Sequence, residues 1–168
     1  MKRCLMLIAV FVVALPLVAQ GPLSTEAQQA WARTSGNMIA AAERMPEENY
    51  SFKPAPESQS FGDLVAHSAN SAMGACSSVN GEAKQAGADA AGSKAAMVTA
   101  LKAAMAECDK ANQSLTDATA TQMIEGRRGA RSRLGTIYGN TIHMEHEYAQ
   151  MAVHFRLKGL VPPSSDRR

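Results

Sequence analysis

Histidine is scarce in this chain, and three of the four histidines lie close together near the C-terminal end. His143, His146 and His154 share that segment with Glu147, while His67 stands alone much earlier. Residues four apart project from the same face of an α-helix, so His143 and Glu147 can reach one ion if the segment is helical. Imidazole and carboxylate groups together are suitable ligands for Zn²⁺, Ni²⁺ or Fe²⁺.

His67 is the residue that could complete such a site. It lies at the edge of an apolar helical stripe, one turn after Leu64, where a buried polar group would need a partner. If the two helical segments are neighbours, His67, His143 and Glu147 can converge into a set of two imidazoles and one carboxylate. Spacing alone leaves the alternative open that His67 is a hydrogen-bonded histidine at the core edge and the later residues form a solvated face.

Helical periodicity dominates the segments that must position these residues. Apolar residues recur at helical spacing over about 24–45, 61–79, 93–115 and 127–158, and no segment alternates convincingly as a strand. Ser24 or Thr25 can cap the first segment, and Ser60, with an acidic residue three positions later, can cap the second. The pattern predicts an all-α fold, a four-helix bundle with long connections over 46–60 and 82–92.

The N-terminus has the pattern of a secretory signal. Lys2 and Arg3 precede an uncharged run over 5–19, which as a helix would span roughly 22 Å, less than the ~30 Å hydrocarbon core. We expect a signal peptide over 1–19 and a mature bundle domain over 20–168, exported to the periplasm or secreted, without stable membrane insertion after cleavage. An uncleaved N-terminal anchor is the alternative.

Export determines how the cysteines and the charge are interpreted. Cys4 leaves with the signal peptide, so Cys76 and Cys108 remain in an oxidising compartment, either as a disulfide or as two buried thiols. Removal of Lys2 and Arg3 reduces 17 basic residues to 15, equal to the 15 acidic ones. A neutral domain lacks the basic excess that phosphate-backbone binding needs, so we expect no nucleic-acid partner.

Weaker features of the sequence do not indicate another catalytic site. There is no Gly-x-Ser-x-Gly turn, no phosphate-binding glycine loop and no Cys-x-x-Cys pair. Tyr138 and Tyr148 are expected to be packing residues. Four arginines are expected at the start of the last helix, where they could contact an anionic ligand or form a solvated basic turn: Arg127, Arg128, Arg131 and Arg133.

Two blocks of the sequence resemble the DinB-like superfamily, also described as DinB/YfiT-like proteins. The first block runs from Tyr50 to Glu57 and continues from Ser60 to His67; the second runs from His143 to Gln150 and ends in the Pro162-Pro163 exit. The resemblance covers nearly the whole mature chain, and the two blocks together are fairly specific.

The resemblance implies a four-helix bundle with one divalent metal held by three histidines. His67 matches the first ligand position and His143 the second, whereas the third falls on Glu147, where the family usually has histidine. Three outcomes follow from this departure: Glu147 is the third ligand, metal binding has been lost, or His146 substitutes for it. The implied metal is Zn, Ni or Fe.

Some relatives resemble thiol S-transferases, so the resemblance also implies a metal-dependent thiol S-transferase or a hydrolase acting on a small-molecule substrate. A rival interpretation from another class is a non-catalytic extracytoplasmic module that binds a ligand or a partner after losing the metal site. Bundles of this kind also allow a homodimer, which nothing in the sequence specifies.

Overall fold

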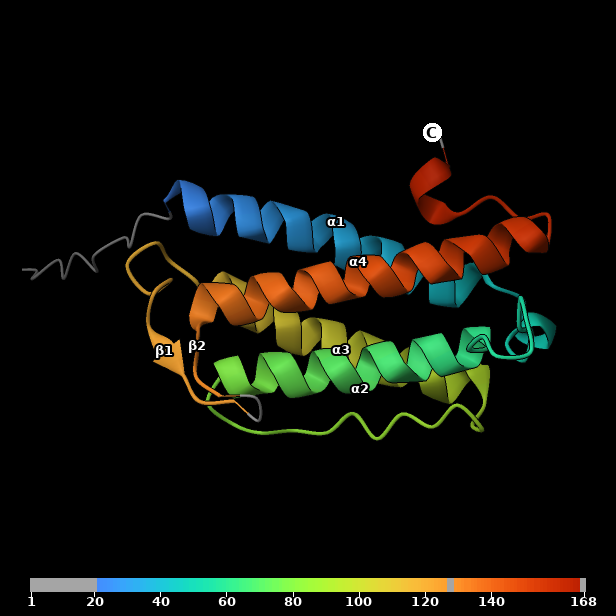
Figure 1. Ribbon diagram of the computed structural model, residues 1–168, viewed down its shortest axis with the longest axis horizontal. Helices are drawn as coiled ribbons and strands as arrows, with labels where there is room; N and C mark the ends of the chain where they lie inside the picture. The colour runs from blue at the N-terminus through green and yellow to red at the C-terminus, as the bar shows by residue number, and fades with distance from the viewer. Residues whose placement is uncertain (1–20, 127–128, 167–168) are drawn as a thin grey trace, which may run out of the picture.

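Four long helices make up most of the computed structural model, which describes residues 21–126 and 129–166 (Figure 1). The predicted all-α bundle is confirmed. The helices are α1 (Pro22–Arg44), α2 (Phe61–Val79), α3 (Lys94–Gln113) and α4 (Arg133–Leu157). Two short 3₁₀ helices, η1 (Glu47–Asn49) and η2 (Pro163–Ser165), follow α1 and α4.

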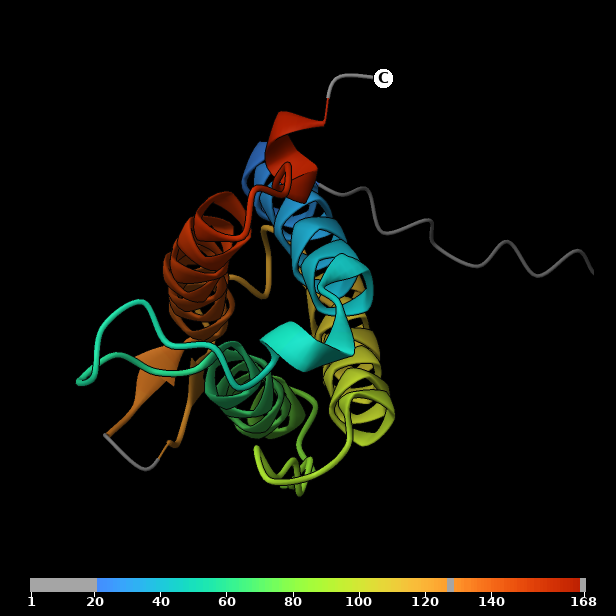
Figure 2. The same cartoon turned by 90° about the vertical axis from the view of Figure 1, so that its right-hand side faces the viewer.

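The order of the helices around the bundle places α2 directly beside α4. Each of α1 and α2 packs against both α3 and α4, so α1 and α2 lie diagonally opposite (Figure 2). Helices α1 and α4 run in one direction and α2 and α3 in the other, so α2 and α4 are antiparallel neighbours (Figure 1). Because α2 and α3 are parallel, residues 80–93 return along the length of the bundle, and they include the predicted loop over 82–92.

The start of α2 is fixed by the predicted cap. The Ser60 hydroxyl accepts from the Asp63 backbone N–H at 3.1 Å, and the Asp63 carboxylate accepts from the Ser60 backbone N–H at 2.9 Å. This reciprocal pair satisfies two donors at the helix end. The hydrogen bond from the Ser60 hydroxyl lowers the pKa of Asp63. Helix α2 therefore begins at a defined residue, which sets the register of His67.

The start of α1 differs from the expectation that Ser24 or Thr25 is the N-cap. The N-cap is Gly21, which provides no side chain, and the helix begins at Pro22. Asp117, from the connection after α3, accepts from the Ser24 backbone N–H at 2.8 Å and its hydroxyl at 2.9 Å. The hydrogen bond from the Ser24 N–H is the main cause of the lowered pKa of Asp117. A carboxylate distant in sequence therefore replaces the local cap.

Helix α4 begins at Arg133, six residues later than predicted. Before it, β1 (Met123–Ile124) pairs antiparallel with β2 (Arg131–Ser132). These short strands were not predicted, because two residues cannot show alternation. Ser132 caps α4 by accepting from the Gly135 N–H at 3.0 Å.

The expected arginine cluster on α4 is correspondingly wrong in part. Arg131 lies in β2, and Arg127 and Arg128 lie outside the described residues. Arg133 is the first residue of α4, and its guanidinium donates to the Val79 carbonyl at 3.1 Å and to the Ser114 hydroxyl at 2.9 Å. Its role is therefore to connect α4 to the ends of α2 and α3.

The two tyrosines of α4 have different surroundings. Tyr148 is buried, as expected, and its hydroxyl accepts from the Ser164 N–H at 2.7 Å. Tyr138 is 54% exposed, so the expectation that it is a packing residue is wrong for this bundle interior. It lies on the outer face of α4 with Ile142, Val153 and Leu157, which are also exposed.

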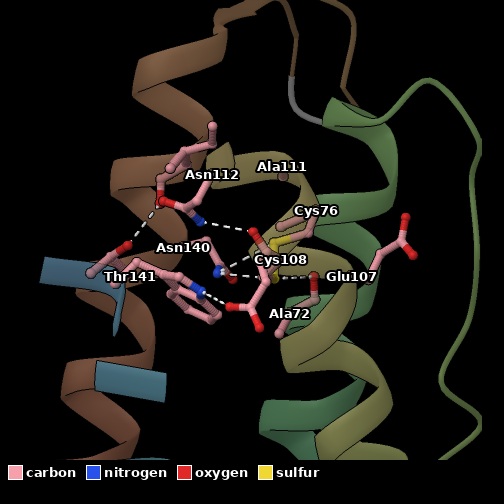
Figure 3. The surroundings of a disulfide bond; sticks show 12 residues. Ala72, Cys76, Glu107, Cys108, Ala111, Asn112, Asn140 and Thr141 are labelled. Atoms are coloured by element: carbon pink, nitrogen blue, oxygen red, sulfur yellow. Dashed lines mark hydrogen bonds between the residues drawn. A yellow bond between two sulfur atoms is a disulfide. The ribbon is translucent and has the colours of Figure 1, made fainter. Parts of the chain in front are cut away.

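A disulfide joins α2 to α3 in the bundle interior. Cys76 and Cys108 are bonded, which decides between the two states that the sequence left open. Both residues are buried, and the Asn140 amide of α4 lies 3.6 Å from each sulfur (Figure 3). Three of the four helices therefore meet at this bond.

The predicted signal peptide over 1–19 lies outside the described residues. Among the helices that the structure does describe, none combines the length and the apolar character needed to span a bilayer.

Candidate metal centre

Helices α2 and α4 bring His67, His143 and Glu147 together. His67 lies in the second turn of α2, whose start is fixed by the Ser60 cap. His143 and Glu147 lie one turn apart on α4, so both project toward the neighbouring α2. Each side chain offers one ligand atom, and these three atoms lie within 4.8 Å of one another. The convergence predicted from sequence is therefore present.

The individual distances define the shape of this group. His67 Nε2 lies 3.1 Å from His143 Nε2 and 3.9 Å from Glu147 Oε1. Glu147 Oε1 also lies 3.6 Å from His143 Nδ1. The two imidazole rings are perpendicular, with centroids 5.2 Å apart. A carboxylate oxygen thus faces both imidazoles.

The donor set fits a divalent ion. At metal–nitrogen distances of about 2.05 Å, the 3.1 Å separation of the two Nε2 atoms corresponds to an N–metal–N angle of roughly 100°, close to tetrahedral. Bonds of this length span at most about 4.2 Å between two ligand atoms. Since the group extends to 4.8 Å, its widest pair must close slightly around an ion.

Burial differs sharply across the three side chains. The Glu147 side chain is 5% exposed, whereas those of His67 and His143 are 45% and 38% exposed. The carboxylate therefore forms the inner wall of the centre, and the imidazoles form its outer rim. A small molecule approaching from solvent would reach the imidazole side first. This gradient gives the centre a closed side and an accessible side.

Neighbouring polar residues fix the carboxylate and the end of α4. The Gln150 amide donates to Glu147 Oε2 at 3.3 Å, which leaves Oε1 facing the imidazoles. One turn further on, His154 is buried, with Nδ1 2.9 Å from the Gln150 carbonyl and Nε2 3.2 Å from the Gln59 carbonyl. Polar residues on α4 thus connect the centre to the 46–60 connection.

Two aromatic residues, Tyr50 and Phe52, anchor the 46–60 connection. Tyr50 is buried, and its hydroxyl donates to the Ala42 carbonyl at 2.6 Å. Burial is the main cause of its raised pKa, with the nearby Glu47 carboxylate adding to it. The Phe52 ring makes an edge contact with His154, at a centroid distance of 5.9 Å.

His146 does not join the centre. In the described part of the chain, the group that could bind an ion contains Glu147 in its place. His146 is exposed, because three residues after His143 the helix has turned its side chain toward solvent. Of the two candidate third residues, only Glu147 faces His67.

One residue near the centre was not recognised from sequence. The Ser71 hydroxyl lies 3.4 Å from His67 Nε2. Its position four residues after His67, hence on the same face of α2, was the available signal. Serine is common on helix faces, so this spacing alone indicated nothing specific.

Comparison with solved structures gives the same helical fold. A DinB-like protein from Bacillus cereus ATCC 10987 superposes with a TM-score of 0.67 at 19% identity, covering 83% of this chain and 95% of that one. A DinB-like protein from Bacillus subtilis superposes with a TM-score of 0.62 at 17% identity, covering 85% and 99%. A DinB family protein from Exiguobacterium sibiricum 255-15 gives 0.64 at 10% identity, covering 84% and 95%.

Sequence comparison identifies the family directly. None of the curated proteins matches the chain. The family model described as the DinB superfamily matches residues 30–151, well over half of the 168 residues. The matched segment includes His67, His143 and Glu147. The chain therefore belongs to the DinB superfamily.

Proposed function

We propose that this protein binds one divalent metal ion, Zn²⁺, Ni²⁺ or Fe²⁺, through His67, His143 and Glu147. The observation that supports the proposal is the 3.1 Å approach of the two Nε2 atoms, with the buried Glu147 carboxylate facing both rings. Two imidazoles and a carboxylate form a ligand set that leaves further positions for water or substrate.

We further propose that the centre serves a metal-dependent reaction on a small molecule, either thiol S-transfer or hydrolysis. A bound divalent ion supplies Lewis acidity, which lowers the pKa of a coordinated thiol or water toward neutral pH. The half-exposed imidazoles leave that side accessible to a substrate. Glu147, with Gln150 on its other oxygen, offsets part of the positive charge from the buried side.

The cellular location belongs to the proposal as well. Lys2, Arg3 and the apolar run after them support export to the periplasm or secretion. The buried Cys76–Cys108 disulfide is consistent with an oxidising compartment, since such bonds form and persist there.

Elemental analysis of the protein, expressed with its own N-terminal segment and purified after export, tests the metal proposal. We expect about one Zn, Ni or Fe per chain in the wild type and a metal-free product from His67→Ala. His146→Ala is the matched control, because that exposed side chain lies outside the centre; it should retain the metal.

A folded wild-type protein that stays metal-free after incubation with each ion would overturn the proposal. It would favour the rival function, a non-catalytic extracytoplasmic module that uses the bundle to bind a ligand or partner. Circular dichroism of each variant establishes that the helices are intact before the metal content is compared.

A further inference from the structure

The Ser71 hydroxyl lies beside the proposed metal centre. Ser71 lies one turn after His67 on α2, and its Oγ is 3.4 Å from His67 Nε2. The same nitrogen lies 3.1 Å from His143 Nε2 and 3.9 Å from Glu147 Oε1. The hydroxyl therefore adjoins the atom around which the three side chains converge.

Metal binding and the Ser71 contact compete for one lone pair. The ring nitrogen of a neutral imidazole that accepts a hydrogen bond is the nitrogen that binds a metal. Once His67 Nε2 coordinates an ion, it cannot accept a hydrogen bond from Ser71. With that lone pair occupied, the hydroxyl would donate to another acceptor, such as a ligand at an open position of the ion.

The burial gradient indicates which side of the ion that ligand would occupy. The Glu147 side chain, 5% exposed, closes the inner side. His67 is 45% exposed, and Ser71 is partly exposed beside it on α2. An incoming ligand would therefore bind on the side where Ser71 lies.

The charge of the ligand set indicates the class of that ligand. Two neutral imidazoles and one carboxylate leave a divalent ion with a net charge of +1. A small monoanion neutralises this charge, and its remaining lone pairs can accept a hydrogen bond from a neutral hydroxyl. No such donor is provided by the imidazoles once they are coordinated through the ring nitrogens facing the ion.

We infer that Ser71 is a positioning residue that donates a hydrogen bond to a monoanionic ligand at the open position of the metal centre. The inference depends on the proposed metal-binding function and adds to it a residue and a class of ligand. Ser71 is not expected to bind the ion itself, because a neutral serine hydroxyl is not among the usual ligands of these metals.

Azide binding to the Co²⁺-loaded protein tests this role. Co²⁺ replaces the native ion and reports each added ligand through its visible absorption spectrum. Azide is titrated into the wild type, Ser71→Ala, Ser71→Thr, which keeps a hydroxyl, and Ser78→Ala as control. The Ser78 hydroxyl, on the same helix, donates to the Ala75 carbonyl at 2.9 Å.

We expect Ser71→Ala to bind azide about ten- to a hundredfold more weakly, which corresponds to the loss of one hydrogen bond to a charged ligand. Its Co²⁺ affinity should stay within about twofold of wild type. Ser71→Thr should restore most of the azide affinity, and Ser78→Ala should match the wild type throughout.

Equal azide affinity in the wild type and Ser71→Ala would overturn the inference, as would a wild-type Co²⁺ protein that does not bind azide. A large loss of Co²⁺ affinity in Ser71→Ala would also overturn it, since Ser71 would then be a ligand. These outcomes leave metal binding by the wild type intact. Failure of the wild type to bind Co²⁺ would instead overturn both this inference and the proposed function.

Discussion

At the scale of single residues, the glutamate at position 147 sets the charge of the three-residue group. A set of three neutral imidazoles leaves a divalent ion with its full charge, whereas Glu147 removes one unit of it. The carboxylate is buried and receives a hydrogen bond from Gln150 on the oxygen that faces away from the imidazoles. The other carboxylate oxygen is thus held facing the imidazoles.

Substitution of Glu147 tests whether the carboxylate is a ligand. We expect Glu147→Gln to weaken Zn²⁺ binding by more than about tenfold, since even outer-shell changes at metal sites cost about 10–100-fold. Glu147→His should retain tight binding, because it restores a nitrogen ligand one turn after His143. Competition with a chromophoric chelator measures both affinities. Unchanged affinity in Glu147→Gln would show that the third ligand is another group.

The convergence of His67, His143 and Glu147 could be predicted from sequence, but the other contacts of these side chains could not. The four-residue spacing of His143 and Glu147 fixes their common helix face. Whether His67 faces them depends on which helices are neighbours, which is a property of the whole bundle. Ser71 could not be assigned to the site from sequence. Its spacing from His67 becomes informative only when the structure shows that Ser71 and His143 both contact His67 Nε2.

At the scale of helices and strands, the local signals were reliable where a cap is made by neighbouring residues. Ser60 and Asp63 form the predicted capping box. Gly21 and Asp117 do not follow such a pattern, because the carboxylate comes from a connection 93 residues after Ser24. The late start of α4 has a similar cause, since the pairing of β1 with β2 removes residues that helical periodicity had assigned to it.

The Asp117 cap makes the stability of α1 depend on pH. The folded pKa of Asp117 is lowered by hydrogen bonds from Ser24, so the cap stabilises the fold above the unfolded pKa of about 3.9 and loses this effect as pH falls through the lower folded pKa. We therefore expect Asp117→Ala to have a lower melting temperature than wild type at pH 7. The difference should shrink steadily as acid is added.

Glu57→Ala, at an exposed position of the 46–60 connection, is the control for this experiment. Melting curves between pH 7 and pH 2.5 provide the measurement. A difference between wild type and Asp117→Ala that is constant over this range would mean that the charge of the carboxylate has no part in the cap.

The disulfide between α2 and α3 contributes stability through the unfolded chain. Cys76 and Cys108 are separated by 32 residues, and closing a loop of this length is worth about 3–4 kcal/mol in the chain-entropy treatment. Replacing both cysteines by alanine should lower the free energy of unfolding by about this amount. Urea denaturation followed by circular dichroism measures it.

The metal content of the double-alanine variant provides the corresponding control. Since Cys76 lies more than two turns from His67 on α2, the folded variant should still bind one ion. Addition of a reductant should reproduce the loss of stability in the wild type and have no effect on the variant. A variant as stable as the wild type would show that the bond adds little beyond the packing around it.

At the scale of the whole molecule, the bundle follows from the sequence but the order of its helices does not. Periodicity gives four amphipathic helices, and each needs two neighbours to cover its apolar face. The parallel arrangement of α2 and α3 needs the long return over 80–93, whose length is visible in the sequence. Its path along α2 depends on contacts such as the Asn70 amide with the Ala88 backbone, which no periodicity indicates.

An ion that joins α2 to α4 should stabilise the complete bundle. A ligand that binds only the native state at 100 times its dissociation constant contributes about 2.7 kcal/mol. For a domain of this size, that corresponds to a rise in melting temperature of roughly 5–10 °C. We expect this rise on adding Zn²⁺ to metal-free wild type, measured by calorimetry, and none for His67→Ala. An equal rise in both would locate the ion elsewhere.

The return segment and the disulfide together affect what proteolysis can do to this molecule. A protease that cuts the exposed backbone between 82 and 92 separates the sequence into two pieces, one with His67 and the other with His143 and Glu147. Because Cys76 is in the first piece and Cys108 in the second, both fragments remain covalently joined. A nicked molecule would run as one band without reductant, with His67 still tethered to the fragment that carries His143 and Glu147.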